Sequence, residues 1–220
     1  MENSSLPAVE LVVRTIAETA VANETWFCQL DSVVGDGDFG YSLARGFEKV
    51  LENFDGLDRS SPGAFLKKVG LMVASRAGGT SGPIWGTAFV RAGAAAGAKA
   101  ELSAADVVAM LRAAVEGIRA RGGASLGDKT LLDALIPAID RLEADLPAGG
   151  VEALANAAQV AECAAAETTG MLAKRGRASY TGERSVGSPD PGAVAIGVIA
   201  GRVSAAWHEY CSSKGENEPS

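Results

Sequence analysis

The chain has 220 residues, of which 47% are hydrophobic and 21% are charged. This is enough apolar material for a packed core and too much for a disordered chain. The formal net charge of −7 argues against a nucleic-acid-binding protein, which normally carries a basic patch for the phosphates. It does not argue against a nucleotide ligand, because a bound metal ion reverses the local charge.

Helical patterns separated by short Gly-rich breaks predict an all-α fold of up-and-down helices. We expect eight helices, beginning near residues 6, 41, 61, 82, 103, 128, 151 and 190. The first is expected to run unbroken to about residue 30. Ser61-Pro62 and the pair Ser103 and Asp106 are typical helix starts. We assign one domain to residues 1–211 and expect a disordered polar tail at 212–220.

Several classes of protein are disfavoured by what the sequence lacks. No apolar run approaches 18 residues, and the N-terminus has no basic region followed by an apolar one, so we expect a cytoplasmic protein without membrane spans. Cys28, Cys163 and Cys211 are far apart and indicate incidental thiols. His208 is the only histidine, which disfavours a Ser/His or Cys/His hydrolase.

The most informative loop lies between the first two predicted helices. Asp31, Asp36 and Asp38 fall within eight residues, with glycines at 35, 37 and 40. Carboxylates this close repel one another unless they share a cation, and Mg²⁺ prefers oxygen ligands of this kind. The alternative is a solvated acidic turn that caps the next helix. A dinucleotide fingerprint is rejected because no strand precedes the glycines, and an EF-hand is rejected because its twelfth position is Phe47.

Three further loops suggest an anion site. Residues 77–82 place glycines, Thr80 and Ser81 before a helix, where backbone amides favour phosphate. Residues 122–130 combine glycines with a helix start, for which a simple cap is the alternative. Residues 174–192 contain Arg177 and the element Asp190-Pro191-Gly192, and arginine is suited to phosphate binding. Together the four loops predict a site for Mg²⁺ and a nucleotide on a helical scaffold.

These motifs resemble the nucleotide-binding L subunit, or C-terminal domain, of dihydroxyacetone kinases. The resemblance covers about residues 11–203 and rests on five ordered motifs, which are GDGDFG (35–40), GGTSGPIWG (78–86), GDKTLLDAL (127–135), GRASYTGERS (176–185) and DPGA (190–193). It implies a barrel or bundle of eight antiparallel helices with the nucleotide in loops at one end. The chain departs from the family at Phe39 and Ser188, where a histidine is common.

The resemblance also implies roles for individual residues. Asp31, Asp36 and Asp38 would hold two Mg²⁺ ions that bridge the nucleotide phosphates. The residues that would bind the ADP or ATP cofactor are Phe39, Gly40, Tyr41, Ser42, Gly79, Thr80, Ser81, Gly122, Leu131, Arg177, Asp190, Pro191 and Gly192. No catalytic residue beyond these metal and phosphate ligands is expected in this chain.

The function implied is phosphoryl transfer from Mg-nucleotide to a ketose that a separate K subunit holds. Retained ADP, rephosphorylated by an M protein of the phosphotransferase system, is the favoured donor. Two alternatives remain: an ATP-dependent kinase subunit for a short sugar such as erythrulose, and a non-enzymatic nucleotide-dependent partner of a transcription regulator. Neither direct nucleic-acid binding nor a membrane partner is expected.

Overall fold

The computed structural model describes residues 4–215, and none of these residues lies in a strand. The α-helices are α1 (Leu6–Ala22), α2 (Glu24–Asp31), α3 (Phe39–Glu52), α4 (Pro62–Arg76), α5 (Ser81–Ala96), α6 (Ala104–Gly122), α7 (Leu131–Asp145), α8 (Gly150–Glu167) and α9 (Pro191–Gly215). Short 3-10 helices lie at η1 (Phe54–Gly56), η2 (Leu146–Ala148), η3 (Thr168–Gly170) and η4 (Arg177–Ser185). The predicted all-α class is confirmed.

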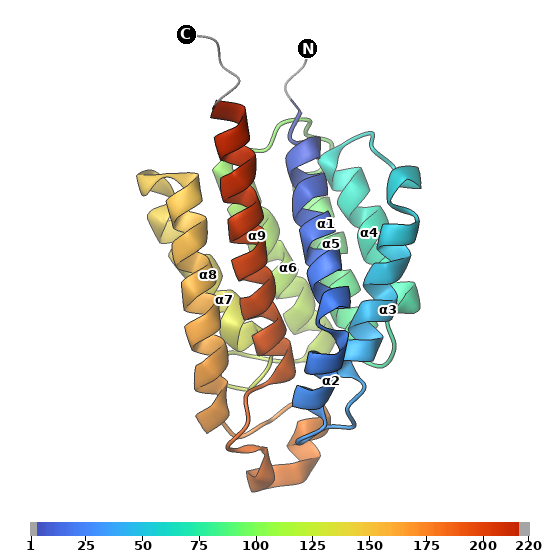
Figure 1. Cartoon of the computed structure of the whole chain (residues 1–220), viewed down its shortest axis with the longest axis vertical. Coiled ribbons are helices and arrows are strands. Elements are labelled where there is room, and N and C mark those ends of the chain that lie inside the picture. The colour runs from blue at the N-terminus through green and yellow to red at the C-terminus, as the bar shows by residue number, and fades with distance from the viewer. Residues whose placement is uncertain (1–3, 216–220) are drawn as a thin grey trace.

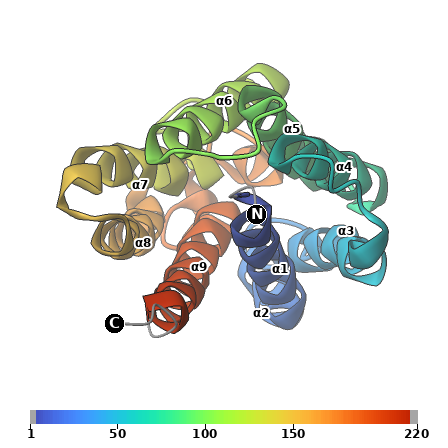
Figure 2. The ribbon, with the colours of Figure 1, turned by 90° about the horizontal axis from the view of Figure 1, so that it is seen from above.

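The long helices form a closed ring (Figures 1 and 2). From α3 to α9, each helix contacts the next one in the chain, and α1 contacts both α3 and α9. The helix α2 continues from α1 and packs against α3 and the start of α9. The ring is therefore closed by the pairing of the first and last helices of the described chain.

Two predicted helix boundaries are wrong. The first helix is interrupted at Asn23, whose backbone leaves helical geometry (φ −104°, ψ 13°) while its side-chain amide donates to the carbonyl of Thr19 at 2.8 Å. Such local side-chain hydrogen bonds compete with a continuing helix. The sixth helix begins at Leu131 and not at 128, because Thr130 is extended and forms a capping box with Asp133.

The predicted tail also differs from the structure where it can be compared. Residues 212–215 continue the helix α9. The remaining tail residues, 216–220, lie outside the described part of the chain. The boundary of the domain at residue 211 therefore stays a prediction.

Two predicted helix starts are confirmed by their hydrogen bonds. The hydroxyl of Ser61 accepts from the amide of Ala64 at 3.1 Å. The hydroxyl of Ser103 accepts from the amide of Asp106 at 3.1 Å, and the carboxylate of Asp106 accepts from the amide of Ser103 at 3.0 Å. Each cap satisfies amides that the helix itself leaves unpaired.

The core lies inside the ring and is built from aromatic, aliphatic and small side chains. Phe27, Phe47 and Phe65 are fully buried, and each contributes about 1.5–3 kcal/mol relative to an exposed side chain. The helices α4 and α5 are in direct backbone contact, since a Cβ atom on Gly70 would lie 2.6 Å from the carbonyl oxygen of Gly86. Glycine is required there because of this close approach.

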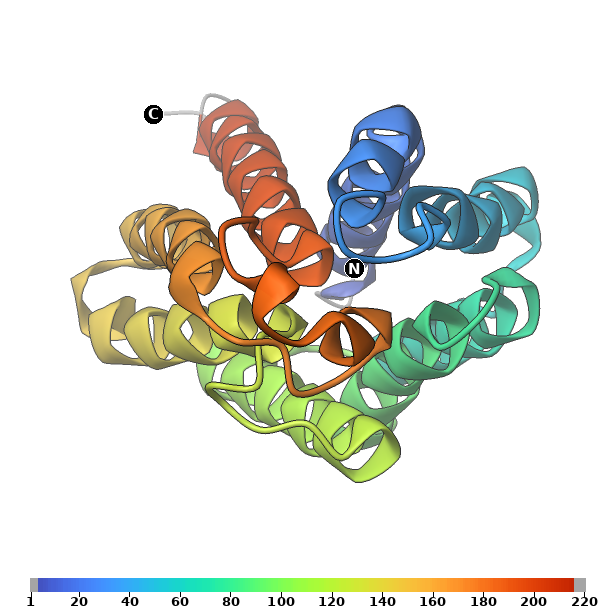
Figure 3. The same cartoon turned by 90° about the horizontal axis from the view of Figure 1, so that it is seen from below.

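The antiparallel arrangement brings four connections to one end of the molecule. These are α2–α3, α4–α5, α6–α7 and α8–α9, and they contain all four loops in which the sequence predicts the site. Figure 3 shows this end directly, with the connection between α8 and α9 crossing the ring.

Candidate Mg-nucleotide site

The three predicted metal ligands lie together. Asp31 ends α2, Asp38 precedes the first turn of α3, and Asp36 lies in the turn between these helices. One carboxylate oxygen from each lies within 4.8 Å of the others. Asp31 and Asp38 are partly exposed and Asp36 is exposed. The carboxylate of Asp31 sits at a helix C-terminus, where the dipole disfavours negative charge, so the cluster needs a cation nearby.

Close backbone contacts fix the acidic turn. The amide of Phe39 donates to Asp31 Oδ2 at 3.3 Å, and the amide of Gly35 donates to the Asp31 carbonyl at 2.6 Å. A Cβ atom on Gly40 would lie 2.1 Å from the carbonyl oxygen of Glu24. Only glycine lets the first turn of α3 approach α2 this closely.

An arginine from a distant part of the chain reaches the cluster. Arg177 forms an ion pair with Asp36, and its Nη2 lies 3.6 Å from Asp38 Oδ2. The Arg177 side chain is 60% exposed, so this pair adds little to the stability of the fold. The structure therefore brings together one predicted nucleotide ligand and two predicted metal ligands.

The helices α3 and α5 begin beside the acidic turn, and neither is capped by the side chain of its own N-cap residue, Asp38 or Thr80, in contrast to Ser61, Ser103 and Thr130. In α3, the amides of Phe39 and Tyr41 are instead bonded to side chains of α2, those of Asp31 and Cys28. The first amides of a helix have no partner within the helix, and a helix N-terminus favours an anion. These two starts are adjacent, because a Cβ atom on Gly78 would lie 2.9 Å from Ser42 Oγ.

The predicted phosphate ligands in the first turn of α3 are only partly available. The amide of Tyr41 donates to Cys28 Sγ at 3.2 Å, and Ser42 is buried. The ring of Phe39 packs on Phe27, with 6.0 Å between centroids. By contrast, Gly79, Thr80 and Ser81 lie at the exposed start of α5, where Gly79 has a positive φ of 56°.

The remaining predicted nucleotide ligands fall into two contacts between elements. A Cβ atom on Gly122 would lie 3.0 Å from Ile84 Cδ1, which places the end of α6 against the start of α5. A Cβ atom on Gly192 would lie 3.3 Å from Leu131 Cβ, which places the start of α9 against the start of α7. Pro191 is the first residue of α9.

Asp190 caps α9 and has an unusual acidity. Its Oδ2 accepts from the amide of Ala193 at 2.7 Å, and its own amide donates to Thr168 Oγ1 at 2.8 Å. Loss of hydration raises the pKa of Asp190 to about 7, with a further upward effect of Asp133 and an opposing effect of Lys129. This carboxyl therefore changes charge near neutral pH.

Lys129 is not among the predicted site residues, and the structure places its side chain among the carbonyls of the connection between α8 and α9. Its Nζ donates to the carbonyls of Met171 at 3.1 Å and Ser188 at 2.7 Å, and also to that of Ser185. We refer to residues 171–188 as the strap. The only sequence signal was a lysine beside the predicted cap at 128–130, which does not reveal a partner about 50 positions away.

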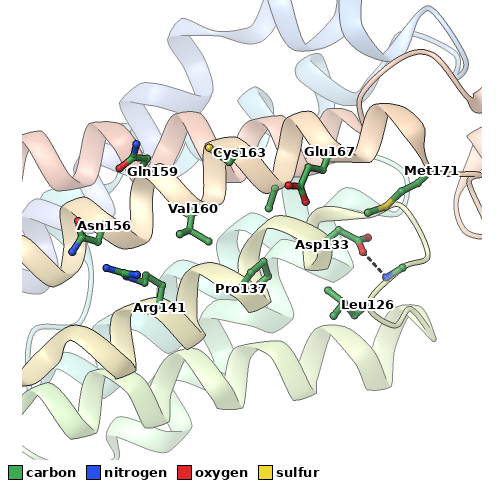
Figure 4. A pocket seen from close by; sticks show the side chains of 12 residues that line it. Leu126, Asp133, Pro137, Arg141, Asn156, Gln159, Val160, Cys163, Glu167 and Met171 are labelled. Atoms are coloured by element: carbon green, nitrogen blue, oxygen red, sulfur yellow. Dashed lines mark hydrogen bonds between the residues drawn. The ribbon is translucent and has the colours of Figure 1, made fainter.

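A cavity of about 790 Å³ lies between α7 and α8 and reaches the connections at this end through Gly127 and Met171 (Figure 4). Among its lining residues are Arg141, Asn156 and Cys163, and none of the predicted metal or nucleotide ligands lines it. Pro137 lies within α7 beside the cavity, and because proline has no N–H, the helix bond to the carbonyl of residue 133 is lost.

The donor set suits a hard divalent cation. The three carboxylates lie close together. Within residues 4–215, Arg177 is the one cation that forms ion pairs with them. Carboxylate oxygens are ligands that Mg²⁺ prefers in proteins. The N-terminus of α5, which has no side-chain cap, lies near the three carboxylates. The residues present therefore fit a magnesium ion together with phosphate groups.

Comparison with known proteins assigns a family to most of the chain. The family model described as "DAK2 domain" matches residues 33–205. The chain is 40% identical over 169 residues to the Escherichia coli protein "PEP-dependent dihydroxyacetone kinase, ADP-binding subunit DhaL", covering 76% of this chain and 80% of that one. It is 37% identical to "L-erythrulose 1-kinase" of Mycolicibacterium smegmatis over 86% of this chain, but over only 33% of that enzyme.

A solved structure has the same fold. The dihydroxyacetone kinase from C. freundii in complex with AMP-PNP and Mg²⁺ superposes with a TM-score of 0.74 at 25% identity. The match covers 93% of this chain and 34% of that kinase, so the chain spans about a third of the larger protein. Within residues 4–215, no helix has the length and apolarity needed to cross a bilayer.

Proposed function

The chain belongs to the DAK2 domain family, and we propose that it is the nucleotide-carrying subunit of a dihydroxyacetone kinase. In this proposal it transfers a phosphoryl group from Mg-nucleotide to a ketose that a separate K subunit holds. The E. coli relative is named an ADP-binding subunit of such a kinase and matches over 80% of its length.

The observation that carries the proposal is the position of the acidic cluster. Asp31, Asp36 and Asp38 converge at the end of the ring where α5 begins without a side-chain cap. A nucleoside polyphosphate needs both cations and oriented N–H donors. Such an arrangement is suited to a phosphate chain bridged to the carboxylates by Mg²⁺.

The residues of this chain would act by binding and orientation. We propose that the three aspartates hold two Mg²⁺ ions, which would neutralise charge on the transferred phosphoryl group. Gly79, Thr80 and Ser81 would orient the phosphates with backbone and hydroxyl donors. Leu131 and Gly122 would contact the nucleoside, as would the start of α9 at Asp190–Gly192. Proton removal from the acceptor would fall to the partner.

Exposed apolar side chains around the same end support docking of a partner there. Tyr180 in η4 is 90% exposed, Val33 in the acidic turn 64% and Tyr41 at the start of α3 55%. Large apolar groups grouped at one end of a protein are typical of an interaction surface. A K subunit docked on them would bring its bound ketose to the nucleotide phosphates.

The proposed donor is ADP that stays bound and is rephosphorylated by an M protein of the phosphotransferase system. The names of several relatives, "PEP-dependent" in E. coli and "PTS-dependent" in Lactococcus lactis, support this source of phosphate. Erythrulose is a second acceptor to test, because three relatives over 33% identical are named erythrulose kinases.

The test is reconstitution with a cognate K subunit. We expect pure protein to release ADP on denaturation. Phosphoryl transfer to dihydroxyacetone should require the K subunit and the M protein, together with phosphoenolpyruvate and the general phosphotransferase proteins. Stoichiometric consumption of ATP with the K subunit alone would instead favour the ATP-dependent alternative. Binding of Mg-nucleotide without transfer to either ketose would contradict the kinase assignment.

A further inference from the structure

Lys129 is a charged residue that is almost fully buried. Its side chain and backbone are only 2% exposed, although lysine is rarely buried without a specific partner. Among residues 4–215 it is also the one non-glycine residue with a positive φ, 61°. A strained conformation of this kind persists only where surrounding contacts hold it.

The contacts that hold Lys129 all come from the strap. An ammonium group has three N–H donors, and those of Lys129 are directed at the carbonyls of Met171, Ser185 and Ser188. Met171 begins the strap and the two serines end it. The Nζ atom of Lys129 therefore links both ends of residues 171–188 to the turn before α7. It acts beside two backbone donors of the strap, the amide of Ala173 to Ser185 Oγ and the amide of Lys174 to the carbonyl of Asp128, each at 3.0 Å.

Burial and charge agree with this geometry. Loss of hydration lowers the pKa of Lys129, and the negative charge of Asp190 acts in the opposite direction. Backbone carbonyls stabilise a buried ammonium through charge-assisted hydrogen bonds. Removal of the ammonium would leave three carbonyls without this partner in a buried place.

The strap carries the residues that reach the nucleotide site. Arg177 lies in its middle and pairs with Asp36 and Asp38. Asp190 and Gly192 follow directly after its end, and Gly192 lies against Leu131. If the strap shifted, the side chain of Arg177 would move away from the acidic cluster, and the start of α9 would move away from α7.

We infer that Lys129 is a positioning residue of the nucleotide site, which acts by fastening the strap across the end of the ring. It touches neither the metal ligands nor the phosphates, and its effect passes through Arg177 and the start of α9. The effect on nucleotide binding rests on the proposed function. The fastening of the strap by Lys129 does not depend on it.

Limited trypsin digestion tests the structural part without any ligand. Lys174, Arg175, Arg177 and Arg184 are exposed cleavage sites within the strap. We expect Lys129→Met to be cut there at least about tenfold faster than the wild type, since cleavage requires the strap to open. Mass spectrometry of the fragments locates the cut. Lys129→Gly is the second variant, because glycine adopts the positive φ without strain and keeps the test valid if the methionine variant does not fold.

The second measurement is the rate at which bound ADP dissociates in Mg²⁺, followed with a fluorescent ADP analogue. We expect both variants to release it at least about tenfold faster, with unchanged far-UV circular dichroism. Lys99→Met is the matched control, since Lys99 is exposed, pairs with Asp106 and lies at the opposite end of the ring. It should alter neither rate.

The outcomes separate the two ideas. A wild type that binds no nucleotide contradicts the proposed function, while faster cleavage of the strap in the variants still supports fastening by Lys129. Strap cleavage equal to that of the wild type in both variants overturns the inference. Faster cleavage with unchanged ADP release, in a protein whose wild type binds ADP, shows that Lys129 fastens the strap without positioning the site and also overturns it.

Discussion

Arg177 and Asp36 are 141 positions apart in the sequence, and their side chains form an ion pair at one end of the helical ring. The pair joins the strap to the acidic turn between α2 and α3. In the proposed site, Mg²⁺ and Arg177 would be alternative positive partners for the same carboxylates, so each is expected to influence the binding of the other.

Removal of one carboxylate from the cluster should weaken Mg-nucleotide binding and leave the fold intact. Contacts to a charged group contribute about 1.5–3 kcal/mol, so Asp36→Asn or Asp38→Asn should reduce ADP affinity in Mg²⁺ by roughly 10- to 150-fold. Isothermal titration calorimetry measures the affinity. The far-UV spectrum should not change, because these side chains lie outside the core. Loss of helicity with unchanged affinity would show that the turn is structural instead.

Replacement of Arg177 should have opposite effects on the two ligands. In Arg177→Met, the carboxylates lose their competing cation, and Mg²⁺ without nucleotide should bind about two- to fivefold more tightly, the range of an exposed ion pair. ADP should bind less tightly, because a phosphate-binding arginine is lost. Arg141→Met is the control, since Arg141 pairs with Asp145 away from the acidic turn. A parallel change in both affinities would contradict the competition.

The raised pKa of Asp190 predicts a stability that depends on pH. In the folded chain, Asp190 keeps its proton up to about pH 7. In the unfolded chain, where its pKa has the ordinary value of 3.8, the same carboxyl has already lost the proton at that pH. The contribution to stability is therefore fully present below about pH 4 and is lost as the pH rises through 7. Asp190→Asn mimics the protonated carboxyl and keeps an oxygen to cap Ala193.

Urea unfolding at two pH values checks this prediction. The Asp190→Asn variant and the wild type should be similar in stability at about pH 4, and the variant should be more stable at about pH 8. A stability difference that is equal at both values would contradict a raised pKa at this position.

The backbone contact between α4 and α5 predicts that one added methyl group at Gly70 lowers the free energy of unfolding. In Gly70→Ala the new Cβ atom would meet the carbonyl of Gly86 at 2.6 Å, and the helices must separate at a cost of about 1–3 kcal/mol. Gly201→Ala is the matched control, because that glycine is exposed on α9 with no atom within 4 Å of the added Cβ. It should gain about 0.5–1 kcal/mol. Equal effects of the two substitutions in chemical denaturation would contradict the contact.

The sequence predicted most of what depends on neighbouring residues. The starts at Ser61 and Ser103 were found because a cap and its partner are three residues apart. The convergence of Asp31, Asp36 and Asp38 was found because the glycines keep them in one short turn. Their place at the same end as the other three loops follows from an antiparallel order of helices.

What the sequence did not predict depends on distant partners or on small differences in backbone energy. Asn23 interrupts the first helix through a bond to a residue four positions earlier, yet the same residue type is tolerated in many helices. Lys129 finds its carbonyl partners 42 to 59 positions away, in a segment without a regular pattern. The roles of the individual nucleotide ligands remain predictions.

The closure of the ring by α9 has a consequence for the order in which the protein folds during synthesis. Because α9 packs against α1, α7 and α8, the apolar surfaces of these three helices that meet α9 stay uncovered until α9 has left the ribosome. A chain stalled before residue 190 would expose them and be prone to aggregate. The helix α9 must then insert between α8, which directly precedes it among the α-helices, and α1, which was made first of the described helices.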